Sequence, residues 1–187
     1  MLDKKVCKNI KMVLLDVDGV MTDGSIYINQ DGEFFKSFNV KDGLAVELLR
    51  SHNILVGIIS GKASAALDTR CQQLGFDEII TGCKNKLPAL IDICSKYKIT
   101  SEQISFLGDD VLDIPIFEKV GLSAAPIDAH KLAIDSADWV SSLKGGEGMV
   151  REFVDLLLVT QLDKPLKEVY EPLLNKIRLD DVATMEQ

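Results

Sequence analysis

The chain has 187 residues, of which 47% are hydrophobic and 27% charged, a composition typical of one soluble globular domain. Its net charge of -8 disfavours a nucleic-acid-binding protein, which needs a basic surface. No apolar stretch is long enough to span a bilayer, and the first residues lack an apolar signal segment, so we expect a cytoplasmic protein without membrane contact. The four cysteines form no CxxC or Cys/His pattern, which indicates reduced thiols rather than disulfides or a zinc site.

The first predicted element is the apolar run at 12–15, which is followed at once by Asp16, Asp18 and Gly19. Such a run is typical of a buried parallel strand, and ligands of open α/β sheets bind beyond the carboxyl ends of the strands. Two carboxylates placed there suit a hard cation such as Mg²⁺. The alternative is an acidic turn that only closes the strand.

A β-hairpin is predicted next, at about 25–38, because two short alternating segments (25–29 and 33–38) flank an Asp-Gly pair. Phe34, Phe35 and Phe38 give this flap more apolar surface than an isolated hairpin should expose, so we expect it to pack on another surface, such as a second subunit. A helical pattern then begins at Asp42, which we take as its N-cap.

Strands and helices alternate through the rest of the chain. We expect strands at 54–59, 78–81, 104–108, 121–125 and 138–141. We expect a helix that contains Leu67 and ends at Gly75, and further helices at 86–98, about 113–120 and about 149–160. The helix at 86–98 should have one apolar face, formed by Leu87, Leu90, Ile91 and Cys94.

This alternation predicts an α/β protein with three layers, in which helices cover both faces of a parallel sheet. We expect one domain over residues 1–162 with no large cap domain. Residues 163–187 are more charged and weakly helical, and we interpret them as an appendage, either a docking helix or a partly disordered tail.

Several predicted strand ends carry polar side chains, and a doubly wound sheet would bring them into one crevice. Besides the Asp16/Asp18 pair, these are Ser60, Lys86, Asp109 with Asp110, and Asp113. Each alone could be a turn, a cap or a solvated residue, but the set fits phosphoryl transfer. Carboxylates would hold Mg²⁺, one Asp would attack phosphorus and its neighbour would move a proton, while a hydroxyl and a lysine would bind the phosphoryl oxygens. Because no GxxxxGK[ST] loop is present, hydrolysis is favoured over kinase chemistry.

The ordered motifs DVDGVMTDG, IISG, NK and GDDVLDIP resemble those of the haloacid-dehalogenase-like phosphatase superfamily. FNVKDG, the segment from Arg70 to Gly75, GDDxxDxP and GGEGMVRE are further similar to its small capless members, the 3-deoxy-D-manno-octulosonate 8-phosphate phosphatases. The resemblance covers about residues 9–158.

The resemblance implies a Rossmann-like fold, Mg²⁺ as cofactor, and a role for each matching residue. Asp16 would be the nucleophile, Asp18 the general acid/base, and Asp16, Asp18 and Asp109 the metal ligands, with Asp110 and Asp113 in support. Ser60 and Lys86 would hold the transferring phosphoryl group. The residues implied in substrate binding are Asp18, Asn39, Lys41, Asp42, Gly43, Lys62, Arg70 and Lys86. The resemblance also implies a homotetramer in which the hairpin and the C-terminal segment cover a neighbour's site.

One departure from the family pattern bears on the substrate. Position 62 carries Lys62, where the octulosonate phosphatases usually have Arg and related phosphatases of nine-carbon keto acids have an acidic residue. A cation suits a substrate carboxylate, but Lys lacks the bidentate geometry of Arg. We therefore expect a phosphatase that releases 3-deoxy-D-manno-octulosonate for lipopolysaccharide synthesis, with two alternatives. One is a phosphatase for a nine-carbon sialic-type 9-phosphate, and the other is a non-catalytic partner module of a cytidylyltransferase.

Overall fold

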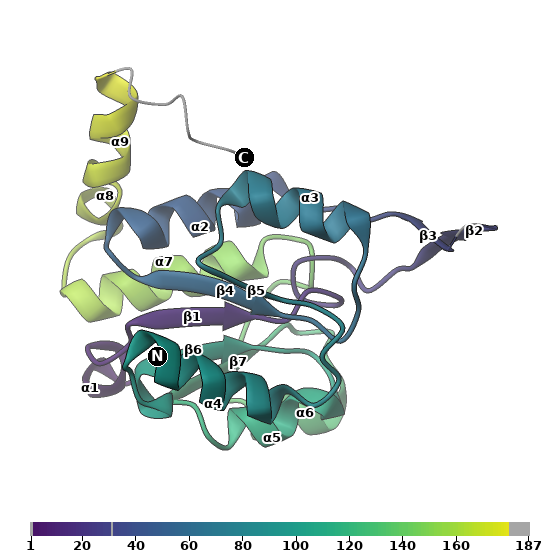
Figure 1. Cartoon of the computed structure of the whole chain (residues 1–187). Coiled ribbons are helices and arrows are strands. Elements are labelled where there is room, and N and C mark those ends of the chain that lie inside the picture. Colours follow the sequence, from purple (N-terminus) through teal and green to yellow (C-terminus); the bar gives the residue numbers. More distant parts are fainter. Residues whose placement is uncertain (1, 31, 180–187) are drawn as a thin grey trace.

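The computed structural model describes residues 2–30 and 32–179, and its centre is a six-stranded parallel sheet with the strand order β5-β4-β1-β6-β7-β8. Figure 1 shows the sheet between two layers of helices, as the alternating pattern predicts. The strands of the sheet are β1 (Met12–Leu15), β4 (Leu55–Ile59), β5 (Glu78–Ile80), β6 (Ile104–Leu107), β7 (Leu122–Ala125) and β8 (Trp139–Val140).

The central strand β1 is buried on both faces, which explains its uninterrupted apolar run. It pairs in parallel with β4 on one side and with β6 on the other. Val13 and Leu15 point into one hydrophobic cluster, whereas Met12 and Leu14 point into the other. The carboxyl end of β1 therefore lies in the middle of the sheet edge.

Each cluster is closed by its own layer of helices (Figure 1). The first layer consists of α2 (Val40–Ser51), α3 (Ala65–Leu74) and α7 (Met149–Leu162), and α1 (Lys4–Cys7) adds Cys7 to the same cluster. The second layer consists of α4 (Lys86–Tyr97), α5 (Ile114–Phe117) and α6 (Lys131–Ser136). Two short 3₁₀ helices, Ser101–Gln103 and Val111–Asp113, precede β6 and α5.

The predicted start of α2 at Asp42 is wrong. Asn39 is the N-cap, because its side chain accepts a hydrogen bond from the backbone N–H of Lys41. Asp42 lies in the first turn, is 1% exposed, and directs its carboxylate toward the start of α7 instead.

The predicted apolar face of α4 is also wrong in part. Its buried apolar residues are Ala89, Leu90 and Ile93, whereas Ile91 is 65% exposed. Lys86, the first residue of the helix, lies on the same face and is buried as well.

The helix predicted at 113–120 is shorter, since a 3₁₀ turn precedes it and Phe117 ends it. The helices α1 and α6 were not predicted.

The hairpin is formed by β2 (Tyr27–Asn29) and β3 (Gly32–Phe35), paired antiparallel, and it projects from the body of the molecule (Figure 1). Residue 31, part of the predicted turn, lies outside the described residues. Ile28 and Phe34 are 72% and 63% exposed, so the hairpin does present apolar surface.

The chain continues beyond α7 into α8 (Leu166–Val169) and α9 (Glu171–Arg178). Val169 and Leu173 are buried in the first cluster, and Lys176 Nζ lies 2.8 Å from Glu47 Oε1 of α2. Residues 163–179 are therefore largely helical and docked on the domain, while 180–187 lie outside the described residues. None of the helices over 2–30 and 32–179 is long and apolar enough to cross a membrane.

Candidate active site

Asp16 follows β1 directly and is fixed at the sheet edge by its own backbone. Its N–H donates to the carbonyl of Leu107, 2.8 Å away, which continues the parallel ladder with β6 by one residue. Its Oδ1 accepts a hydrogen bond from the Val17 N–H at 2.7 Å. Burial raises the pKa of Asp16 to about 6, although the neighbouring Lys86 acts to lower it.

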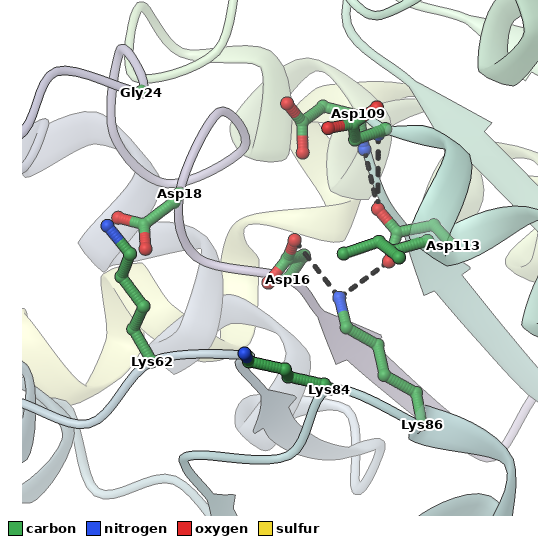
Figure 2. Close-up of a pocket in the computed structure, with 11 residues that line it drawn as sticks. Asp16, Asp18, Gly24, Lys62, Lys84, Lys86, Asp109 and Asp113 are labelled. Atoms are coloured by element: carbon green, nitrogen blue, oxygen red, sulfur yellow. Dashed lines mark hydrogen bonds and ion pairs between the residues drawn. The ribbon is translucent and has the colours of Figure 1, made fainter.

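Lys86 connects two of the carboxylates. Asn85 caps α4, so Lys86 is the first residue of the helix, and its ammonium nitrogen lies 3.0 Å from Asp16 Oδ2 and 2.5 Å from Asp113 Oδ1. Burial alone would lower the pKa of Lys86, but Asp16 and Asp113 outweigh that effect and raise it. Figure 2 shows the amine between the two carboxylates. Lys86 is therefore a cation held beside the carboxylates of Asp16 and Asp113.

Asp113 also orients the loop after β6. Its Oδ2 accepts hydrogen bonds from the N–H groups of Asp109 (2.9 Å) and Asp110 (3.3 Å), and the Asp113 side chain is almost fully buried. Burial, followed by the negative charges of Asp16 and Asp113, raises the pKa of Asp109 to about 8.

Carboxylate oxygens of Asp16, Asp109 and Asp113 lie within 4.8 Å of one another. The negative charges of Asp16 and Asp113 contribute to the raised pKa of Asp109, and a divalent cation would neutralise this repulsion. Oxygen donors of this kind are the ligands that Mg²⁺ and similar hard cations take. The donor set therefore fits a divalent metal ion. Asp16 and Asp109 each have at least one carboxylate oxygen that is not in contact with Lys86.

Asp18 lies in the loop that follows β1, where Lys36 of the hairpin segment reaches it. Lys36 donates a hydrogen bond to Asp18 Oδ1 at 2.5 Å and also lies 3.1 Å from Glu33 Oε2. Burial would lower the pKa of Lys36, but the Asp18 and Glu33 carboxylates raise it. Sequence reasoning did not include Lys36; the signal available was a basic residue at the base of an apolar hairpin.

A pocket of about 300 Å³ opens over these residues (Figure 2). Its charged lining consists of Asp16, Asp18, Asp109, Asp110, Asp113, Lys62, Lys84 and Lys86. Lys84 was not predicted, although its place two residues before Lys86 could have indicated it. Apart from Lys86, the lysines of the lining have no carboxylate within ion-pair distance among the described residues, so Lys62 and Lys84 can meet an anionic ligand.

Other predicted site residues do not line this pocket. Ser60 directly follows β4, is 1% exposed, and accepts a hydrogen bond from the Lys62 N–H at 3.2 Å. Arg70 lies in α3 with its guanidinium 5.9 Å from the centre of the Phe38 ring. Gly43 is buried in α2.

The predicted substrate residues of the FNVKDG motif contact the GGEG loop instead of the pocket. Asn39 Nδ2 donates to the Gly146 carbonyl at 3.1 Å. Asp42 accepts from the N–H groups of Gly148 (3.2 Å) and Arg151 (3.0 Å), and burial raises its pKa to about 6. Lys41 offers its carbonyl to Arg151 at 3.3 Å. A substrate role for these residues stays a prediction.

The GGEG loop (residues 145–148) contacts the loop that follows β1 directly. The Gly146 N–H donates to the Val20 carbonyl at 2.9 Å, and a Cβ added to Gly145 would lie only 1.9 Å from the Gly19 carbonyl oxygen. Two sequence motifs that lie far apart in the chain are thus packed against each other.

Comparison with known proteins identifies the family of this chain. The family model described as haloacid dehalogenase-like hydrolase matches residues 62–152. The 3-deoxy-D-manno-octulosonate 8-phosphate phosphatase KdsC of Salmonella typhi is 46% identical over 154 residues, 82% of each chain, and that of Escherichia coli K12 is 45% identical over the same share.

Solved structures give the same result. The cobalt-bound deoxy-D-mannose-octulosonate 8-phosphate phosphatase of Haemophilus influenzae is 36% identical with a TM-score of 0.85, covering 90% of this chain and 99% of that one. The phosphatase of Moraxella catarrhalis, in complex with magnesium, phosphate and KDO, is 33% identical with a TM-score of 0.82, covering 86% and 92%.

The fold and the site define a phosphoric monoester hydrolase of the haloacid dehalogenase-like class. Within that class, the chain belongs to the KdsC family of phosphatases.

Proposed function

We propose that this protein hydrolyses 3-deoxy-D-manno-octulosonate 8-phosphate to the free sugar acid and phosphate, with Mg²⁺ as the metal. The observation that carries the chemistry is the placement of Lys86 3.0 Å from Asp16, with Asp109 and Asp113 beside them. The substrate is inferred from the KdsC relatives at 45–46% identity and from the KDO, phosphate and magnesium in the Moraxella complex.

The residues divide the proposed reaction into two displacements. Asp16 attacks phosphorus, a P–O bond to its carboxylate forms, and the bond to the sugar oxygen breaks while Asp18 donates a proton to that oxygen. Asp18 then takes a proton from water as the water oxygen attacks phosphorus and releases Asp16 and inorganic phosphate. Ser60 and Lys86 bind the phosphoryl oxygens. The metal, held by Asp16, Asp109 and the backbone of Asp18, would neutralise phosphate charge.

Lys62 and Lys84 support a substrate with a second anionic group. Both line the pocket that holds Asp16, and a sugar acid presents a carboxylate beyond its phosphate. Either lysine can bind that carboxylate as a point charge, which supports an acidic sugar ester over a neutral one.

A panel of esters assayed with and without Mg²⁺ tests the substrate. We expect the highest kcat/KM for the octulosonate 8-phosphate, a lower value for a nine-carbon keto acid 9-phosphate, and loss of activity with EDTA. Preference for the nine-carbon ester would assign the protein to that alternative. Absence of phosphate release from every ester would favour the non-catalytic partner module.

Asp16→Asn is the matched variant for the panel. It is nearly isosteric, so we expect it to keep the fold and the thermal unfolding midpoint while abolishing turnover. Activity near that of the unchanged protein would remove Asp16 from the role of nucleophile.

The same proposal includes three further points. The protein forms a homotetramer with shared active sites, it is cytoplasmic, and its sugar-acid product is used in lipopolysaccharide synthesis. The exposed apolar side chains of the hairpin, Ile28 and Phe34, support an interface between subunits. We expect the mass from light scattering to be that of a tetramer, and Ile28→Ser with Phe34→Ser to lower it. A monomeric unchanged protein would contradict this part.

A further inference from the structure

Lys36 is a buried cation in an otherwise exposed hairpin segment. It follows β3, whose Phe34 and Phe35 are 63% and 39% exposed, yet the Lys36 side chain is only 1% exposed. Its four-carbon chain runs inward instead of into solvent, and its ammonium group ends in the active site at Asp18.

The contacts of this ammonium group are specific. It donates to Asp18 Oδ1 at 2.5 Å and lies 3.1 Å from Oε2 of Glu33 in the preceding strand β3. Because burying an ammonium group is unfavourable unless it is paired, these carboxylates are what keeps it inside. The pair joins Lys36 of the hairpin segment to Asp18, which lies 18 residues earlier in the chain and two residues after Asp16.

The contact also restricts how Asp18 can meet a substrate. A carboxyl group held at Oδ1 cannot rotate freely, and Oδ2 is the oxygen left for the ester oxygen of the substrate. Lys36 can donate to Oδ1 whether or not a proton sits on Oδ2, so the contact is compatible with both displacement steps.

We propose that Lys36 is a positioning residue for the acid/base group, which fixes the Asp18 carboxyl so that Oδ2 faces the leaving oxygen. The proposal rests on the phosphatase function proposed above. It means that the base of the hairpin takes part in the orientation of the catalytic machinery, in addition to any role of the hairpin tip at an interface.

The proton that Asp18 supplies matters only for some substrates, and this gives a selective readout. A sugar alkoxide is a poor leaving group and needs the proton as its bond to phosphorus breaks. The phenolate of p-nitrophenyl phosphate leaves without one. Loss of Asp18 orientation should therefore lower kcat/KM for the sugar ester much more than for p-nitrophenyl phosphate, whereas general damage to the site should lower both alike.

The experiment compares Lys36→Met and Lys36→Gln with the unchanged full-length protein on two esters, p-nitrophenyl phosphate and the best sugar phosphate of the panel. General acid catalysis contributes about 10²–10⁴-fold, so we expect about a 10- to 100-fold loss of kcat/KM on the sugar ester and less than about threefold on p-nitrophenyl phosphate. The two variants remove the charge with different shapes, so either one that folds, as judged by circular dichroism and thermal unfolding, gives the result.

Two further variants separate positioning from structure. Glu33→Gln removes the other partner of Lys36 and keeps the contact with Asp18, so its effect should be the same small factor on both esters. In an Asp18→Asn background, Lys36→Met should add less than about a twofold loss on the sugar ester, because the group that it orients is already gone.

The outcomes are distinct. Equal losses on both esters in a folded Lys36 variant, or a full additional loss in the Asp18→Asn background, would overturn the positioning role. Failure of the unchanged protein to hydrolyse either ester would instead contradict the proposed function itself.

Discussion

Gly19 approaches Asp109 so closely that a Cβ at position 19 would lie 2.1 Å from Asp109 Oδ2. Its backbone φ of +85° is also one that other residues rarely adopt. The glycine of the DxDG motif is therefore required for two reasons: the positive φ of the turn, and the close approach of this turn to Asp109.

Gly19→Ala should therefore displace Asp109 from the carboxylate cluster. A displacement of about 1 Å in a catalytic group can lower the rate ~100-fold, and we expect a loss of that order in Mg²⁺-dependent phosphate release. Gly82→Ala is the control, because Gly82 also has a positive φ of +70° but its added Cβ would meet nothing nearer than 4.0 Å. Equal activity in the two variants would show that backbone conformation, and not the Asp109 contact, limits position 19.

The buried position of Lys86 predicts an effect on both stability and catalysis. Lys86→Met leaves the carboxylates of Asp16 and Asp113 without their cation, and breaking such a buried pair typically lowers the free energy of unfolding by about 3–5 kcal/mol. We expect phosphate release to fall at least about 100-fold, as for other removed electrostatic donors. Urea unfolding and the phosphate assay measure the two effects. Lys96→Met, which removes an exposed partner of Glu78, should change neither, and an equally active Lys86→Met would contradict the assignment.

The convergence of Asp16, Lys86 and Asp109 could be predicted because it follows from local patterns. Apolar runs and caps locate the strands and helices, and parallel strands bring their carboxyl ends to one edge of the sheet. Asp113 was expected in support of the metal, and its contact with Lys86 is the detail that only the structure supplies.

The contacts that sequence reasoning missed depend on residues far apart in the chain. Asp42 looked like a helix cap, but its partners lie more than 100 residues away in the Gly148–Arg151 segment. Lys36 lies in the predicted hairpin and Lys84 in a predicted loop, and only the folded chain shows that both reach the site. Nothing in the spacing of α4 indicated that Ile93, and not Ile91, would face the core.

The C-terminal helices should contribute to the stability of the whole domain. Leu173 of α9 is 1% exposed within the first hydrophobic cluster, so Leu173→Ala should lower the free energy of unfolding by about 2–5 kcal/mol. Ile177→Ala in the same helix should have a much smaller effect, because Ile177 is 50% exposed. Denaturant unfolding of both variants tests this, and similar values for the two would show that α9 is not docked in solution.

Asp42 predicts a pH dependence of stability that is independent of the metal site. Its folded pKa of about 6 exceeds the ordinary value of 3.8, chiefly because the carboxyl is buried, so between pH 4 and 6 the folded protein holds a proton that the unfolded chain has released. The free energy of unfolding should therefore fall as the pH rises from about 4 to about 6 and, for this group, stay level above that. The full effect corresponds to about 3 kcal/mol.

Asp42→Asn isolates this contribution, because an amide keeps an acceptor oxygen for the Gly148 and Arg151 N–H groups but does not titrate. We expect the stability of the variant relative to the unchanged protein to increase between pH 4 and pH 7 in urea unfolding with EDTA present. EDTA matters because a bound metal would add its own pH dependence through Asp16 and Asp109. If the difference between the two proteins is constant across this range, the buried carboxyl is held charged by the α7 N-terminus, and the helix dipole outweighs the burial.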